Sequence, residues 1–204
     1  TKDRFLSIIS HELRGSVGTL ETFSQMILDK AQEMGHSILQ NDIQKICNTT
    51  SRMNRLLNNL LTWAKLQSSK FSTNPVNLNL KELTQSQIDW HHLLSRDKGI
   101  EITLDSPPDV IVRADKDQLE FVVRNLISNA IKFTPHLGKI NLNIYRSQEN
   151  GFAAHISITD TGVGMDEQQV SKLFKISEIQ STLGTGGEEG SGLGLILCSE
   201  FIEK

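Results

Sequence analysis

The chain has 204 residues and a formal net charge of −3, with 21 Lys and Arg against 24 Asp and Glu. This balance gives no reason to expect a nucleic acid or an anionic membrane as a partner. No apolar run reaches membrane-spanning length and no signal peptide opens the chain, so we expect no membrane contact here. Two distant cysteines favour a reduced, cytoplasmic setting. Both ends look cut, and a longer protein could carry a membrane anchor.

The first seventy residues carry two helical patterns. One runs from about Lys2 to Met34 and stops before Gly35. The other spaces its apolar residues four and three apart over more than three heptads, from Leu39 to Ala64. Together they predict an antiparallel helical hairpin over 1–69. Because a lone hairpin cannot bury a continuous apolar stripe, we expect two copies to form a four-helix bundle. The alternative is packing against the chain's own C-terminal part.

Residues 70–79 break this period with polar residues and an Asn-Pro step, which predicts a linker. Beyond it the pattern alternates between helix and strand. We expect helices at 80–96, from 115 or 116 to 133, and from 193, and strands at 100–104, 110–112, 139–146 and 152–160. The fold class is therefore α+β, a helical hairpin followed over 80–204 by an α/β sandwich with helices on one face of a largely antiparallel sheet.

The predicted helix ending at 133 has a polar stripe opposite its apolar one. Asn125, Asn129 and Lys132 follow one another at i, i+4 and i+7. Two amides and an ammonium on one stripe can hold a hydrated divalent cation and polyphosphate oxygens. A solvated helix face is the simpler interpretation of this triplet alone.

The next strand ends in an Asp-Thr-Gly-Val-Gly turn. Alternation places Asp160 on the same face as Ile158, so we expect its carboxylate to point inward, where the amine of adenine could donate to it. Gly162 and Gly164 would let the backbone approach a ligand closely. A plain turn is the alternative.

A glycine-rich stretch from Gly184 to Gly194 runs into the last helix. Backbone amides at a helix N-terminus form a cradle for phosphate. The polar segment from Phe174 to Gly190 has the composition of a lid that closes over a nucleotide, or of a disordered linker.

The first helix carries His11-Glu12 beside its apolar seam. His11 lies two residues from Ile9, roughly 200° around a helix, so its imidazole should point into solvent. An ordinary surface histidine is the simplest interpretation of this stretch alone.

The order of these segments resembles a sensor histidine kinase over nearly the whole chain. Five motifs look like that family's H, N, G1, F and G2 boxes, which are FLSIISHELR, NLISNAIKFTP, DTGVGM, LFKI and GSGLGL. Five boxes in the right order behind a helical hairpin are a specific signal.

The resemblance implies ATP-dependent autophosphorylation of His11, with Glu12 orienting the imidazole and accepting its proton. The phosphoryl group would then pass to an aspartate of a response regulator receiver domain. Homodimerisation through the hairpin and a Bergerat-type sandwich are implied too. Asn129 would be the Mg²⁺ ligand, and the ATP-binding residues would be Asn125, Asn129, Lys132, Phe133, Asp160, Gly162, Gly164, Ser181, Thr182, Gly190, Gly192, Leu193 and Gly194.

Three departures from the family pattern carry predictions of their own. Gly15 stands where the family has Thr or Asn, so we expect weak phosphatase activity toward the regulator. Ser16 replaces a helix-bending proline, and Gly/Ser pairs are themselves kink sites. The family continues with one or two more strands after Lys204, so we expect a sandwich lacking its last strands.

Two alternatives remain. One is a catalytically silent, nucleotide-binding scaffold of a signalling dimer. The other is an ATPase related to gyrase, mismatch-repair or chaperone enzymes, which share the N and glycine boxes but have no histidine-bearing hairpin upstream.

Overall fold

A computed structural model describes residues 17–31, 37–66, 73–146, 154–175, 182–188, 190 and 192–203. It divides into two compact units, Thr1–Phe71 and Ser72–Lys204. The first unit is helical, and the second combines two small sheets with five helices among its described residues. This is the α+β class that the residue patterns predict.

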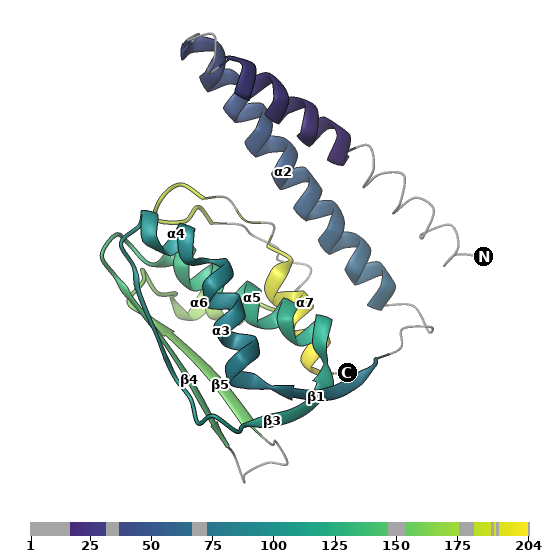
Figure 1. Cartoon of the computed structure of the whole chain (residues 1–204), viewed down its shortest axis with the longest axis vertical. Helices are drawn as coiled ribbons and strands as arrows, with labels where there is room; N and C mark the ends of the chain where they lie inside the picture. The colour runs from purple at the N-terminus through teal and green to yellow at the C-terminus, as the bar shows by residue number, and fades with distance from the viewer. Residues whose placement is uncertain are drawn as a thin grey trace, which may run out of the picture. The chain divides into compact units, whose positions relative to one another are not determined.

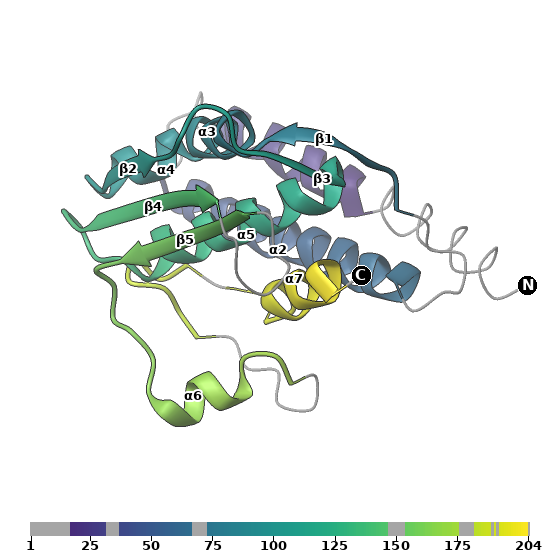
Figure 2. The same cartoon turned by 90° about the horizontal axis from the view of Figure 1, so that it is seen from below.

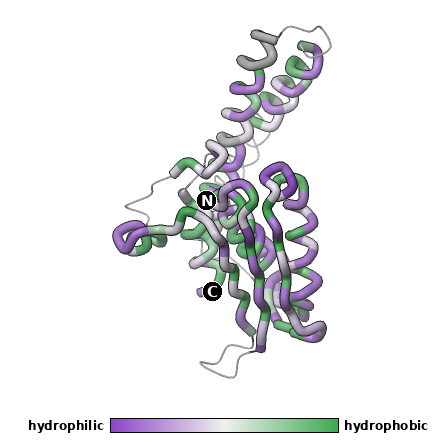
Figure 3. Tube along the Cα trace, turned by 90° about the vertical axis from the view of Figure 1, so that its left-hand side faces the viewer, coloured by the Kyte–Doolittle hydropathy of each residue, from purple (hydrophilic) through white to green (hydrophobic). Residues whose placement is uncertain are grey.

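The described part of the first unit consists of two helices (Figure 1). Residues 17–31 form one, and Ser37–Leu66 form the other, α2. They pack on each other through apolar side chains. Leu28 and Ala31 of the first helix and Ile43 and Cys47 of α2 form one buried cluster. Apolar residues recur along both helices, which Figure 3 shows as green bands between purple ones.

A polar contact also joins the two helices. The Glu21 carboxylate accepts hydrogen bonds from Ser51 Oγ at 2.5 Å and from Asn54 Nδ2 at 2.9 Å. The hydrogen bond from Ser51, followed by that from Asn54, lowers the pKa of Glu21 despite its partial burial. The charged form of Glu21 is therefore the one that fits this place in the hairpin.

Many apolar side chains of the two helices remain exposed in a single copy of the hairpin. Met53 is 58% exposed and Phe23 57% exposed, although both belong to the predicted apolar seams. The exposed set is Leu20, Phe23, Met26, Ile27, Ile46, Met53 and Leu60. The hairpin therefore has more apolar surface than its own interface covers.

The second unit begins with strand β1, Pro75–Asn79, inside the segment that the sequence assigned to a linker. β1 pairs antiparallel with β3, Ile111–Asp115. The proline occupies the first strand position, where its missing N–H costs no ladder bond. Val76 and Leu78 alternate with Asn77 and Asn79, but this mostly exposed strand is only five residues long and follows directly on the Asn-Pro step, so the linker was predicted to extend to Asn79.

The larger sheet has three strands in the order β2–β4–β5. β2, Glu101–Asp105, runs parallel to β4, Lys139–Arg146, and β4 pairs antiparallel with β5, Ala154–Asp160. The sheet is thus mixed. The predicted hairpin turn at 149–151 lies outside the described residues.

Two helices replace the single one predicted at 80–96. α3, Leu80–Trp90, is capped by Asn79, whose side chain accepts from the Lys81 and Glu82 amides. α4, His92–Asp97, follows after His91, whose φ of −91° and ψ of 4° interrupt the helix. The His91 ring nitrogen Nδ1 lies 2.8 Å from the Gln87 carbonyl oxygen, so the buried histidine finds its partner within α3.

α5, Lys116–Phe133, is the central helix of this unit and has the predicted bounds. Asp115 caps its start by accepting a hydrogen bond from the Gln118 amide. α3 and α5 cover one face of the larger sheet (Figure 1). Their shared core comprises Leu83, Ile100, Val123, Ile127, Ala130, Ile131, Ile140 and Leu142.

Two further helices complete the described unit. α6, Glu167–Lys172, starts with a reciprocal capping box between Asp166 and Gln169, and it stands away from the sheet (Figure 2). α7, Gly194–Glu203, packs on α5. There the rings of Phe121 and Phe201 meet edge to face, with their centroids 5.2 Å apart. α7 begins within one residue of its predicted start.

Candidate nucleotide site

The polar stripe of α5 lies where the predictions placed it. Asn125, Asn129 and Lys132 are half-buried, whereas the opposite stripe of the helix is in the core. Asn125 Nδ2 donates to the Phe121 carbonyl at 2.8 Å, which fixes its amide orientation. Its Oδ1 therefore faces the start of α7, where it lies 2.6 Å from the position that a Cβ on Gly194 would take. Only glycine fits at the start of α7 without moving this amide.

The loop after β5 touches the other end of α5. The Val163 amide donates to the Phe133 carbonyl at 3.2 Å. A Cβ on Gly162 would lie 2.6 Å from that same carbonyl oxygen, so this glycine allows the backbone to pass α5. Gly164 has a φ of +68°, a conformation that glycine adopts without strain.

Asp160 lies on the predicted face of β5 but is not buried. It is opposite Ile140, which is fully buried, just as Ile158 is opposite the buried Leu142, so alternation holds to the end of the strand. As the last residue of β5 its side chain is exposed, and its Oδ1 accepts a hydrogen bond from the Gly162 amide at 2.8 Å. The carboxylate thus stabilises the glycine turn and remains accessible to a ligand.

The glycines of 184–187 lie on the C-terminal end of α5 and are separate from the start of α7. The Thr185 amide donates to the Lys132 carbonyl at 3.0 Å. A Cβ on Gly184 would lie 2.7 Å from that carbonyl oxygen, so the backbone contact requires glycine. Only Gly192, with a φ of +73°, Leu193 and Gly194 directly precede or begin α7.

Lys132 connects the helix to this glycine-rich segment. Its Nζ donates to the Thr182 carbonyl at 2.7 Å and lies 4.6 Å from the centroid of the Phe133 ring. The ammonium is therefore close to Phe133 and to Thr182, two of the predicted site residues. A phosphate group reaching Lys132 would compete with the Thr182 carbonyl for this donor.

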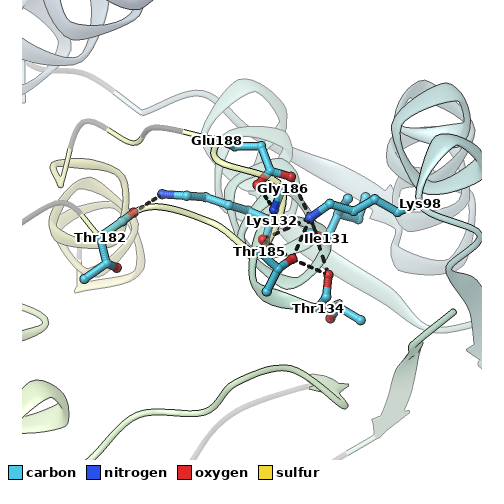
Figure 4. Close-up of polar contacts among 8 residues, drawn as sticks. All are labelled: Lys98, Ile131, Lys132, Thr134, Thr182, Thr185, Gly186 and Glu188. Carbon is cyan, nitrogen blue, oxygen red and sulfur yellow. Dashed lines mark hydrogen bonds and ion pairs between the residues drawn. The ribbon is translucent and has the colours of Figure 1, made fainter. Parts of the chain in front are cut away.

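Lys98 was missed by sequence reasoning. It follows α4, and only 8% of it is exposed, yet its ammonium reaches the C-terminal end of α5 and the loop at 185–188 (Figure 4). A lysine between a helix and a strand gives no signal in the sequence, because its partners are far along the chain. Three segments, those at 162–163, 184–188 and 192–194, therefore converge on α5.

Several predicted residues lie outside the described residues. These are His11, Glu12 and Ser181, together with Gly15 and Ser16 of the first helix. Gly190 is described and half-buried. No helix among the described residues is both long and apolar enough to cross a membrane.

The donor set suits a cation held mainly by its nucleotide. No three His, Cys, Asp or Glu side chains gather into a metal cluster within the described ranges. Asn129 offers one amide oxygen on the exposed side of α5. Magnesium keeps several waters and takes one or two protein oxygens beside phosphates, so a single amide oxygen fits that coordination.

Two family models match the chain. Residues 1–69 match the "His Kinase A (phospho-acceptor) domain". Residues 114–204 match the "Histidine kinase-, DNA gyrase B-, and HSP90-like ATPase". The second range contains α5, the loop after β5 and the glycine-rich segments that meet at the candidate site.

Known proteins are similar over the whole length of the chain. "Autoinducer 2 sensor kinase/phosphatase LuxQ" of Vibrio vulnificus (strain YJ016) is 28% identical over 209 residues, covering 100% of this chain and 24% of that protein. The chain thus spans about a quarter of such relatives.

Solved structures share the fold. Full-length ShkA in complex with AMPPNP matches with a TM-score of 0.72 and 22% identity, covering 97% of this chain and 40% of that one. The histidine kinase ThkA in complex with the response regulator protein TrrA matches with a TM-score of 0.59 and 22% identity, covering 90% and 54%.

Proposed function

Because this chain belongs to the sensor histidine kinases, with a phospho-acceptor domain followed by an ATPase domain, we propose that it transfers the γ-phosphoryl group of ATP to His11. The observation that carries this proposal is the convergence of three glycine-containing segments on α5. Such a site, built from backbone amides, amides of side chains and one ammonium, suits a polyphosphate. ATP as the donor favours the cytoplasm as its location.

Different residues of the site bind different parts of the nucleotide. The accessible Asp160 carboxylate accepts from the exocyclic amine of adenine, while the Gly162 turn holds that carboxylate in place. Asn125 and Lys132 face the phosphates. Asn129 would hold Mg²⁺, which would neutralise charge on the phosphates when bound. Phe133, Gly164, Ser181, Thr182, Gly190, Gly192, Leu193 and Gly194 complete the pocket.

The chemical step requires little from the protein beyond positioning and charge. A neutral imidazole nitrogen of His11 attacks the γ-phosphorus, and a new N–P bond forms as the bond to the bridging oxygen of ADP breaks. Glu12 orients the ring and accepts the N–H proton. Histidine suits this role because it is neutral near pH 7.

The phosphoryl group then passes to an aspartate on a response regulator receiver domain. The complex of ThkA with TrrA supports this partner, since that histidine kinase shares the present fold. The N–P bond of phosphohistidine breaks as the carboxylate oxygen forms its bond to phosphorus, and the leaving imidazole takes up one proton from solvent, which restores the neutral ring.

The exposed apolar side chains of the hairpin support a homodimer. Ile46, Met53 and Leu60 are seven residues apart on α2 and form an exposed stripe beside the hairpin interface. On the other helix, Leu20 and Phe23 are exposed as well. A second copy would bury both stripes in a four-helix bundle.

The remaining features follow from the family pattern. Residues 1–69 act as the phosphotransfer unit, the segment 70–74 is the hinge, and the part from β1 onward is a Bergerat-type domain. Gly15 offers no side chain to position a hydrolytic water, so dephosphorylation of the regulator is slow. Rapid loss of phosphate from a phosphorylated regulator on adding this chain would contradict that expectation.

Incubation with γ-labelled ATP and Mg²⁺ tests the activity. A histidine kinase gives protein-bound label that acid releases and base preserves. A silent scaffold binds ATP without acquiring label, and an ATPase of the gyrase type releases phosphate over many turnovers without a phosphoprotein. The match of 1–69 to the phospho-acceptor domain favours the kinase over that ATPase.

A further inference from the structure

The Lys98 ammonium has five oxygen atoms around it (Figure 4). Three are carbonyl oxygens at the C-terminal end of α5, belonging to Ile131 at 2.9 Å, Lys132 at 3.1 Å and Thr134 at 3.4 Å. The others belong to the glycine-rich segment, Thr185 Oγ1 at 2.9 Å and Glu188 Oε1 at 2.5 Å. Lys98 is thus the common partner of the helix end and this segment.

The three carbonyls alone account for the ammonium as a helix cap. A cation near the C-terminus of a helix balances the negative end of its dipole, and its three N–H groups find partners there. The contacts of Lys98 with Glu188 and Thr185 are not required for capping the helix. Both residues lie far along the chain, at least 87 positions after Lys98. Lys98 therefore caps α5 and also holds the segment that ends at Glu188.

Residues 182–188, here called the anchored loop, are tied together internally. The Gly184 amide donates to the Glu188 carbonyl at 2.8 Å, and the Gly186 amide donates to Glu188 Oε2 at 2.8 Å. Thr185 Oγ1 donates to the Thr134 carbonyl at 2.7 Å. A displacement at Glu188 would therefore move the loop as a unit.

The other end of the anchored loop meets a phosphate-side residue. Thr182 supplies the carbonyl that accepts from Lys132 Nζ at 2.7 Å. Lys98 thus contacts the anchored loop at Thr185 and Glu188, and the Lys132 ammonium contacts it at Thr182. The first pair, Lys98 with Glu188, joins a mostly buried ammonium to a half-buried carboxylate, a pair that holds its geometry better than two exposed charges do.

We propose that Lys98 is a positioning residue for the triphosphate of the bound nucleotide. Through Glu188 and Thr185 it holds the anchored loop on the end of α5, and the loop in turn sets where the Lys132 ammonium lies. Lys98 itself does not touch the nucleotide. The inference rests on the proposed function, because it assigns Lys98 to the ATP site described above.

The Glu188→Gln variant separates this role from simple capping. It leaves Lys98 and its three helix carbonyls in place but removes the charge that ties the loop. Binding to the full chain is measured by displacement of a fluorescent ATP analogue with ATP and, separately, with adenosine. We expect ATP binding to weaken roughly fivefold, as for loss of one charge-assisted contact, and adenosine binding to change less than about twofold.

Glu101→Gln is the matched control. Glu101 pairs with Lys139 at 3.0 Å on the larger sheet, where both side chains are exposed. Both nucleotide affinities of this variant should equal those of the wild type. Thermal unfolding of both variants should stay close to the wild-type midpoint, and amide hydrogen exchange within 182–188 should rise in Glu188→Gln alone.

Lys98→Met completes a double-mutant cycle with Glu188→Gln. The effects of the two substitutions on ATP affinity should be less than additive, because both break the same contact. The proposal is overturned if Glu188→Gln binds ATP as the wild type does, or if it weakens ATP and adenosine in equal proportion. Failure of the wild-type chain to bind ATP at all would instead overturn the proposed function.

Discussion

At the scale of single residues, the candidate site depends on close contacts that glycine permits. Gly162 lies against the backbone carbonyl of Phe133, Gly184 against that of Lys132, and Gly194 against the side-chain amide of Asn125. The sequence predicted that glycines would shape a pocket. It could not assign Gly184 to the end of α5, because that contact joins residues about fifty positions apart.

Gly184→Ala tests whether this close approach matters. The new Cβ would lie 2.7 Å from the Lys132 carbonyl oxygen and 2.5 Å from Lys132 Cγ, and the carbonyl cannot yield without disturbing α5. We expect the loop to be displaced at a cost of about 1–3 kcal/mol, and ATP affinity to fall. Titration with AMPPNP measures the loss. An unchanged affinity would show that the loop position does not affect the nucleotide.

Two further residues show where single-sequence reasoning ends. Strand alternation predicted the face of Asp160 correctly, since it lies opposite the buried Ile140, but it could not show that the side chain at the end of the strand is exposed. Lys98 drew no prediction because a buried lysine is recognised only by its partners. Those partners lie on α5 and in the anchored loop, which the sequence does not place beside it.

At the scale of elements, regular periodicity was sufficient wherever an element is half-buried. The bounds of α5 and β4 agree with the predictions because each has one apolar face. The prediction missed β1, whose alternation covers only five residues beside an Asn-Pro step, and it missed the break at His91, where one predicted helix becomes two. α6 was not predicted, although a capping box marks its start, because its six residues are too few to show a helical period.

The contact between Glu21 and α2 predicts how the hairpin responds to acid. Its pKa is lowered in the folded state from 4.5, chiefly by the hydrogen bond from Ser51. The stabilisation is therefore present above that pH and is lost as the pH falls through the lowered value. Thermal unfolding across this range should show a larger acid loss in the wild type than in Glu21→Gln. Equal losses would contradict the contribution of this carboxylate.

At the scale of the whole molecule, the order of the motifs indicates the function more specifically than any single motif does. The polar stripe of α5, the turn after β5 and the glycines before α7 each have a simple structural interpretation. Their convergence on one helix, and the matches of 1–69 and 114–204 to two domains of one family, agree with a single nucleotide-dependent activity.

The proposed homodimer predicts the effect of a charge on the exposed stripe. Met53→Glu would place a carboxylate within the interface of the bundle, so we expect the dimer to dissociate at concentrations about tenfold higher or more than the wild type. Asn48→Glu is the control, because Asn48 is exposed and lies roughly 140° around α2 from Met53. Sedimentation equilibrium measures both. Equal dissociation constants for the two variants would exclude the stripe as the interface.

The central claim is that His11 accepts the phosphoryl group of ATP. The most direct measurement compares base-stable label from γ-labelled ATP on the wild type, His11→Ala and His92→Ala. The last variant is the control, because it removes an exposed histidine of α4. We expect equal label on the wild type and His92→Ala, and none on His11→Ala. Label that persists on His11→Ala, or an unlabelled wild type that still binds ATP, would contradict it.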